Sequence, residues 1–164
     1  MTLLTRGLAT AVAIAILDQL TKLAVLRFFA ERGPGERLVP VTSFFDLVLT
    51  YNRGVSFGLF NGGNDAGGEL NAIGFSVAAA AIVALLIFWL SRVASFYMAA
   101  AIGLIIGGAV GNVVDRLRIG AVVDFLYFHA GSWYWPAFNL ADSGICIGVG
   151  AMLLDGLLLR RPAR

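Results

Sequence analysis

Four long apolar stretches alternate with polar connections along the chain. They cover about residues 8–28, 70–90, 95–114 and 137–159, and each is close to the roughly 20 apolar residues that a helix needs to cross a bilayer. The pattern therefore predicts an all-α polytopic membrane protein with four transmembrane helices. Because the number of crossings is even, we expect both termini on the same side of the membrane.

The connections between these helices differ in length. Residues 91–94 form a tight hairpin, whereas residues 29–69 and 115–136 form long loops on the opposite face of the membrane. Binding and catalytic residues are frequent in loops that a rigid scaffold holds in place. We therefore expect the functional site under the two long loops.

The first long loop contains a strand-like pattern. Residues 45–51 favour a strand, and the Asn-Arg-Gly sequence at residues 52–54 is typical of a turn into a second strand at residues 55–57. We expect a small β-hairpin or sheet at the outer membrane surface. The composition of residues 61–68 indicates a mobile loop, and Pro136 is expected to begin the last helix.

The composition supports a membrane protein with one domain. Of the 164 residues, 59% are hydrophobic and only 13% are charged, and the mean hydropathy is +0.86, so one soluble core of this size could not bury the apolar surface. We treat residues 1–164 as a single membrane-embedded domain. The net charge of +2 comes from dispersed arginines, which does not favour a nucleic-acid partner and leaves anionic phospholipid headgroups as the counter-charge.

The distribution of arginines gives an orientation. Their density is higher on the side of the short hairpin and the termini than on the side of the long loops. Cytoplasmic loops carry an excess of basic residues. We therefore expect cytoplasmic termini and a site toward the outer face.

Two aspartates are the strongest candidates for chemistry. Asp124 lies in the second long loop, and Asp142 lies near the same face in the fourth helix, so their carboxyl groups can converge and share one proton. That arrangement suits an aspartyl protease, in which one carboxylate activates water and the other protonates the scissile carbonyl. In the simplest structural interpretation, Asp124 pairs with Arg116 or Arg118 and Asp142 only hydrogen-bonds within the bundle.

Two other classes of function remain open on these residues alone. A small proton-coupled carrier could use Asp18, Lys22 and the outer carboxylates as a relay, although a carrier site is expected near the bilayer midplane. A non-catalytic assembly factor would explain the glycine-rich helices but not the convergent carboxylates. Proton flux that survives loss of Asp142 would favour the carrier.

Polar amides fall on the same face as the two aspartates. Asn52, Asn112 and Asn139 can hold a peptide backbone or orient a carboxylate, although each could equally form a cap or a turn. His129 is the only histidine, so the sequence lacks a ligand set for zinc and a serine–histidine pair. We expect no metal and no cofactor.

The chain resembles the lipoprotein signal peptidase (signal peptidase II) family over most of its length. Four ordered motifs carry the resemblance: Asp18-Gln19-Leu20-Thr21-Lys22, Asn52-Arg53-Gly54-Val55-Ser56-Phe57-Gly58, Gly111-Asn112-Val113-Val114-Asp115-Arg116 running on to Gly120-Ala121-Val122-Val123-Asp124-Phe125, and Phe138-Asn139-Leu140-Ala141-Asp142-Ser143. The resemblance implies a catalytic dyad of Asp124 and Asp142. It also implies that Asn52, Gly54, Asn112, Arg116 and Asn139 line the site.

The resemblance further implies the substrate and the compartment. The substrate would be a prolipoprotein with a diacylglyceryl-modified cysteine, cut on the amino side of that cysteine. The enzyme would act in the bacterial inner membrane, without a cofactor, and would be sensitive to globomycin. A monomer is sufficient for this chemistry.

Four further residues are expected to support the site structurally. Asp18 and Lys22 are one helical turn apart and can pair inside the bundle. Asp115 is expected to position Arg116 and to cap the third helix, and Ala141 belongs to the fourth motif. Glycines at four-residue spacing in the third and fourth helices predict close helix packing.

Overall fold

The computed structural model describes residues 1–33, 35–54 and 65–159. The elements follow in the order α1 (Leu3–Ala30), β1 (Leu38–Pro40), β2 (Phe45–Asn52), α2 (Asp65–Leu90), α3 (Phe96–Ile119), β3 (Val122–Ala130), β4 (Trp133–Phe138), α4 (Leu140–Leu154) and η2 (Asp155–Leu159), the last being one π-helical turn. In the described residues, four helices are long and apolar enough to cross a membrane. The expected all-α membrane bundle with a small sheet is confirmed.

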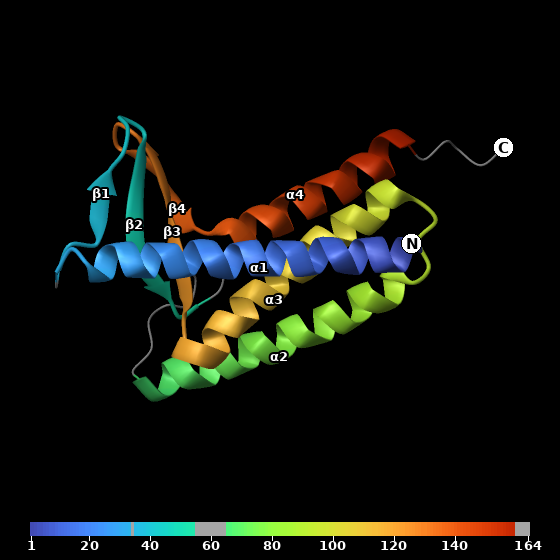
Figure 1. Cartoon of the computed structure of the whole chain (residues 1–164), viewed down its shortest axis with the longest axis horizontal. Helices are drawn as coiled ribbons and strands as arrows, with labels where there is room; N and C mark the ends of the chain where they lie inside the picture. Colours follow the sequence, from blue (N-terminus) through green and yellow to red (C-terminus); the bar gives the residue numbers. More distant parts are fainter. Residues whose placement is uncertain (34, 55–64, 160–164) are drawn as a thin grey trace.

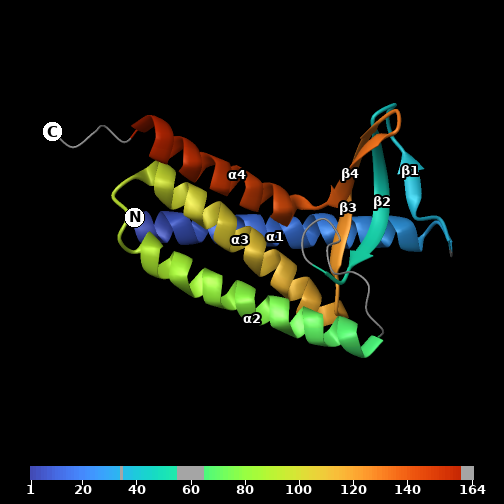
Figure 2. The ribbon, with the colours of Figure 1, turned by 180° about the vertical axis from the view of Figure 1, so that it is seen from behind.

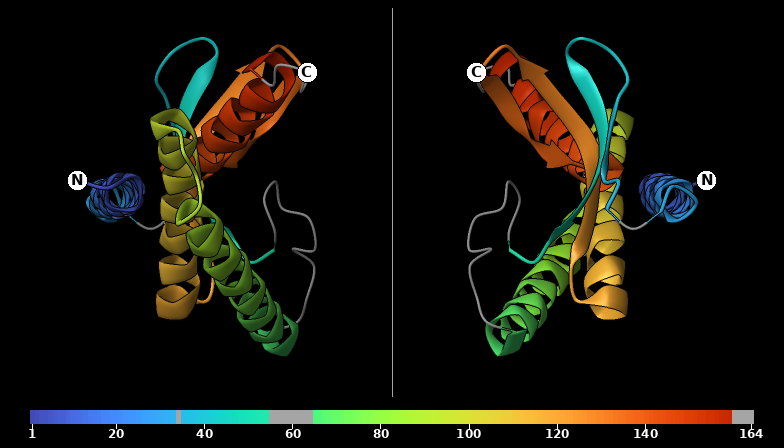
Figure 3. Two further views of the ribbon diagram at one scale, coloured as in Figure 1. Left: turned by 90° about the vertical axis from the view of Figure 1, so that its right-hand side faces the viewer. Right: turned by 90° about the vertical axis from the view of Figure 1, so that its left-hand side faces the viewer.

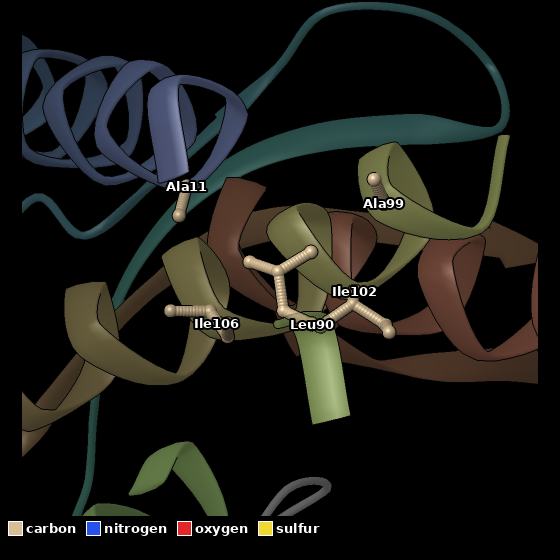
Figure 4. Close-up of a cluster of buried hydrophobic side chains, with 5 residues drawn as sticks. All are labelled: Ala11, Leu90, Ala99, Ile102 and Ile106. Atoms are coloured by element: carbon tan, nitrogen blue, oxygen red, sulfur yellow. The ribbon is translucent and has the colours of Figure 1, made fainter. Parts of the chain in front are cut away.

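The helices form a bundle with α3 at its centre. Helix α3 packs against α1, α2 and α4, and Figure 3 shows it between them when the molecule is viewed along its long axis. Figure 4 shows a buried cluster that joins three helices, made of Ala11, Leu90, Ala99, Ile102 and Ile106. The start of α1 and the end of α4 both lie at the end of the bundle away from the sheet (Figure 1).

Small residues allow the helix backbones to approach closely, as expected. A Cβ added to Gly107 would collide with the backbone oxygen of Ala11, and one added to Gly108 would collide with that of Ala141. Gly148 meets the oxygen of Ala101 in the same way. The glycines therefore fix α1 and α4 directly against α3.

The strands form one antiparallel sheet across the end of the bundle. Its order is β1-β2-β3-β4, and Figures 1 and 2 show the strands running across the long axes of the helices. The register pairs Phe45 with Phe128 between β2 and β3, and Phe128 with Trp135 between β3 and β4. Bulges interrupt both pairings, between Leu47 and Thr50 and between Leu126 and Phe128.

Several boundaries differ from the sequence prediction. Helix α2 begins at Asp65, so residues 65–68 are helical and not part of a loop. Helix α3 runs on to Ile119 and ends where Gly120 adopts a left-handed conformation with φ of 71°. The expected loop at 115–136 is therefore helix, turn and two strands.

The start of the last helix was also predicted wrongly. Pro136 lies in β4, and α4 begins only after Asn139, which caps it. The strand expected at residues 45–51 is confirmed as β2. Its expected hairpin partner through Val55 and Phe57 lies outside the described residues, and β2 pairs instead with β1 and β3.

Candidate active site

Asp124 and Asp142 meet through a single asparagine at the sheet end of the bundle. Asn139 donates from Nδ2 to Asp124 Oδ1 at 2.7 Å and from its backbone N–H to Asp142 Oδ2 at 3.2 Å. Asp124 lies on β3 with only 3% of its surface exposed, and Asp142 lies in the first turn of α4. One residue thus bridges two carboxyl groups from different elements.

The local sequence explains why Asn139 can do this. Its side-chain Oδ1 accepts the backbone N–H of Asp142 at 2.9 Å, and the Asp142 carboxylate accepts the backbone N–H of Asn139. The two residues form a reciprocal capping box at the start of α4. The helix N-terminus therefore fixes Asp142 and leaves the Asn139 amide nitrogen free to bind Asp124.

Two more asparagines supply the remaining donors to the carboxylates. Asn52 donates to Asp124 Oδ2 at 3.1 Å, and Asn112 donates to Asp142 Oδ1 at 2.9 Å. Each asparagine oxygen is in turn bound by an obligate donor, Gly54 N–H for Asn52 and Lys22 Nζ for Asn112. Since an ammonium or a backbone N–H cannot accept, the amide nitrogens must point at the carboxylates.

The environment of Asp124 favours its protonated form. Burial and, secondarily, the nearby charge of Asp142 raise the pKa of Asp124 from 3.8 to about 7, against the opposing hydrogen bonds from Asn52 and Asn139. In the part of the chain that the structure describes, neither aspartate forms an ion pair with Arg116 or Arg118. The simple structural interpretation of Asp124 as an arginine partner is therefore wrong.

A buried ion cluster lies beneath the asparagines. Lys22 Nζ lies 2.8 Å from Asp18 Oδ2 and 2.8 Å from Asp115 Oδ2, and Lys22 is 2% exposed. The expected pairing of Asp18 with Lys22 is confirmed. Asp18 also accepts the backbone N–H of Ala141 at 2.9 Å, which ties α1 to the start of α4.

Asp115 does not act as predicted. Its carboxylate binds Lys22 and accepts the backbone N–H of Val123 at 3.1 Å, so it fixes the start of β3 rather than Arg116 or the helix end. Gln19 belongs to the first motif, but no contact was predicted for it. It donates to Asp115 Oδ1 at 2.9 Å and to the Gly111 carbonyl at 3.1 Å.

Arg116 and Gly54, both expected to line the site, are in direct contact. Arg116 Nη2 donates to the Gly54 carbonyl at 3.0 Å, and the guanidinium carbon lies 5.8 Å from the centre of the Phe75 ring. The Nε of Arg116 is buried and, in the described residues, has no hydrogen-bond partner. A guanidinium N–H left unsatisfied in this way is available to a carbonyl or carboxylate of a ligand.

An apolar cavity opens beside Arg116. Its volume is about 310 Å³, and it lies between α2, α3 and α4. Its lining residues are Phe75, Ala78, Ala79, Ile82, Ile105, Ala109, Asn112, Arg116 and Ile145. The cavity combines aliphatic walls with two polar groups of the site.

The described residues contain no cluster of three or more metal-ligating side chains. His129 Nε2 lies 3.2 Å from Asp46 Oδ2, but without hydrogen-bond geometry. This pair joins β2 to β3 on the face of the sheet opposite to that of Asp124.

The residues that the sequence predicted for the dyad and its lining lie together in the structure. They are Asn52, Gly54, Asn112, Arg116, Asp124, Asn139 and Asp142.

Known proteins share both the sequence and the fold. A profile of the family described as Signal peptidase (SPase) II matches residues 10–158. The lipoprotein signal peptidase of Methylobacterium sp. (strain 4-46) is 46% identical over 149 residues, covering 91% of this chain and 87% of that protein. That of Rhodopseudomonas palustris (strain TIE-1) is 49% identical over 156 residues, covering 93% and 92%.

Two solved structures, both described as bacterial membrane enzymes, match nearly the whole chain. One has a TM-score of 0.76 at 26% identity, covering 96% of this chain and 93% of the other, and the second has a TM-score of 0.73 at 28% identity, covering 93% and 92%. With the profile and the relatives, they establish the relationship. The chain belongs to the signal peptidase II family, and it is a membrane protease that removes signal peptides from prolipoproteins.

Proposed function

We propose that the chain is an aspartyl endopeptidase that cuts diacylglyceryl-modified prolipoproteins on the amino side of the lipidated cysteine, with Asp124 and Asp142 as its catalytic dyad. The observation that carries the proposal is the bridge that Asn139 forms between the two carboxyl groups. Every carboxyl oxygen of the dyad accepts a hydrogen bond from an asparagine side chain or from the Asn139 backbone. This preorganisation suits a site where charge must move between two carboxyl groups.

The two aspartates take different roles in the first step. Asp142 lies at the N-terminus of α4, which stabilises negative charge, so it is the ionised partner and removes a proton from water. Asp124, whose pKa is raised to about 7, carries the proton and donates it to the scissile carbonyl oxygen. The water oxygen bonds to the carbonyl carbon and forms a neutral gem-diol.

The second step reverses the roles. Asp142 returns its proton to the amide nitrogen as the carbon–nitrogen bond breaks, and Asp124 takes a proton from one hydroxyl of the diol. The products are the carboxyl end of the signal peptide and the free amine of the cysteine. The dyad ends the cycle with the single proton with which it began.

The cavity beside Arg116 can hold an apolar part of the substrate. Its aliphatic walls suit the hydrocarbon of a signal peptide or an acyl chain. The unsatisfied Nε of Arg116 can donate to a peptide or ester carbonyl that enters with it. Asn52 and Gly54 close the site from the sheet side.

The substrate assignment is tested with the purified protein in detergent. A diacylglyceryl-modified precursor and the same precursor without the lipid are incubated separately, and the products are identified by mass spectrometry. We expect cleavage of the modified precursor alone, at the bond before the cysteine, with inhibition by globomycin and no effect of a metal chelator. Cleavage at another bond, or equal cleavage of the unmodified precursor, would contradict the proposal.

We also propose that the enzyme lies in the inner membrane as a monomer, with cytoplasmic termini and the site toward the outer face. The basic residues near the termini and the short α2–α3 turn support this orientation. Alkaline phosphatase fused to the C-terminus should be inactive in cells, and green fluorescent protein fused there should fluoresce. The reverse pattern would overturn the orientation.

A further inference from the structure

The outer half of the sheet has two chemically different faces. Side chains alternate along a strand, so Asp124, Leu126, Phe128 and Ala130 of β3 share one face. The register adds Phe45 of β2 and Trp135 and Trp133 of β4 to that face, opposite Phe128 and Ala130. We call Phe45, Phe128, Trp133, Trp135 and Phe138 the aromatic face.

The aromatic face is exposed at Phe128, Trp133 and Trp135, whereas Phe45 and Phe138 are half-buried. The rings of Phe45 and Phe128 lie 4.9 Å apart between centroids, Phe128 and Phe138 lie 5.9 Å apart, and Trp133 and Trp135 lie 6.1 Å apart. Trp133 is 58% exposed and Trp135 is 45% exposed. None of the five residues is charged, and so large an apolar surface marks an interaction site.

The opposite face of the same strands is polar. Asp46 lies beside His129, and Tyr127 contacts both His129 and Tyr134. Tyr134 is 62% exposed, more than either neighbouring tryptophan. The two faces therefore differ in chemistry, although both present an exposed aromatic side chain from β4.

The aromatic face points in the same direction as Asp124. Asp124 binds Asn139 at the start of α4, so its face of the sheet is directed toward α4, whereas Phe125 on the opposite face packs against Val25 and Phe29 of α1. Figures 1 and 2 show that the turns joining β1 to β2 and β3 to β4 extend well clear of the helices. The exposed part of the face thus overhangs the space beside α4, whose outward Ile147 and Leu153 are exposed in the way expected of lipid contact.

We infer that the aromatic face binds the interfacial region of the bilayer, where the sheet rests on the phospholipids beside α4. Tryptophan is enriched at this depth because its ring is apolar and its N–H is polar. An apolar face backed by a polar one is the pattern of a surface that lies in the membrane plane. The contact would hold β3, and with it Asp124, at a fixed height above the spans.

The tryptophan content of the chain makes the depth measurable. The sequence holds three tryptophans, and Trp89 lies at the opposite end of the bundle, so Trp89→Phe leaves only the two reporters on the aromatic face. This variant is reconstituted into vesicles of phosphatidylcholine and phosphatidylglycerol with bromine near the headgroup end or near the methyl end of the acyl chains. We expect blue-shifted emission and stronger quenching by the shallow bromine.

Two outcomes would overturn the inference. Emission typical of water-exposed tryptophan, unquenched by either lipid, would show that the face does not contact the bilayer. Protection that appears only after a precursor is added would assign the face to a peptide instead of lipid. Both results are distinct from failure of the proposed cleavage, because the measurement needs no substrate turnover.

A pair of face-matched variants tests the consequence for activity. Trp133→Ser with Trp135→Ser should lower cleavage severalfold in vesicles but not in detergent micelles, whereas Tyr134→Ser on the polar face should leave both activities unchanged. An equal effect of Tyr134→Ser, or an equal loss in micelles, would contradict a role for the aromatic face in membrane contact.

Discussion

Asn139 illustrates how one residue can combine structural and chemical tasks. It caps α4, binds Asp142 through the backbone and binds Asp124 through the side chain. Its orientation is fixed by the Asp142 N–H, just as Lys22 fixes Asn112 and Gly54 fixes Asn52. Residues that look like ordinary caps and turns thus present a set of donors to the dyad.

The raised pKa of Asp124 predicts the pH dependence of cleavage. A pKa of about 7 means that the carboxyl is protonated below that pH and loses its proton above it. In the proposed mechanism Asp124 donates a proton to the scissile carbonyl, so kcat/KM should fall as the pH rises through about 7. The measurement is the initial rate of cleavage at low precursor concentration across a pH series, and a rate that stays constant to pH values well above 7 would contradict this role.

Removal of the buried cation should destabilise the protein strongly. Lys22→Met would leave Asp18 and Asp115 without their common partner, and breaking a buried ion pair in this way costs about 3–5 kcal/mol. We expect a large fall in the unfolding temperature in detergent, partly restored by adding Asp18→Asn. Arg27→Met, an exposed change on the same helix, is the control and should leave the unfolding temperature unchanged.

The sequence predicted which residues gather at the candidate site more accurately than it predicted which partners each of them contacts. The dyad and its asparagines belong to motifs that the resemblance makes recognisable. The contact between Gln19 and Asp115 depends on how closely α1 approaches α3 at Gly111, and no local pattern encodes that distance. For the same reason Asp115 was assigned to its chain neighbour Arg116 and not to Lys22.

At the scale of elements, the helices were predictable, whereas β1, β3 and β4, three of the four described strands, were not. A transmembrane helix is recognised in the sequence by its length and apolar content, because the positions that face lipid are apolar. Strand β3 carries Asp124 and His129 among its apolar residues, and β4 contains Pro136, which is more typical of a helix start or an edge strand. Their pairing is long-range and depends on β2, so the segment was predicted as a loop.

The packing of α1 on α3 makes a prediction about single glycines. Gly107→Ala would push a methyl group into the Ala11 carbonyl of α1, whereas Gly150→Ala on α4 meets nothing within 4 Å. We expect the first change to lower the unfolding temperature and the second to leave it unchanged or raise it slightly, since alanine favours a helix more than glycine does. Thermal unfolding of the two variants in the same detergent is the comparison, and equal effects would argue against close packing at Gly107.

At the scale of the whole molecule, the fold holds a polar site at the edge of an apolar bundle. The buried Lys22 cluster joins α1 to α3, Asp18 joins α1 to α4, and Asp115 joins α3 to β3. All the elements that supply the dyad are therefore tied to one buried cluster. The cavity between α2, α3 and α4 reaches the same site from the apolar side.

The most direct test of the dyad is the cleavage rate of three aspartate variants on the diacylglyceryl-modified precursor. Asp124→Asn and Asp142→Asn each remove one proton carrier, whereas Asp46→Asn changes a buried aspartate of the same sheet that lies beside His129 and outside the dyad network. We expect each dyad variant to lose activity by about 10²–10⁴-fold or more while it remains folded, because a positioned acid or base contributes on that order. Asp46→Asn should cleave at close to the unmodified rate, and near-normal cleavage by either dyad variant would contradict the assignment.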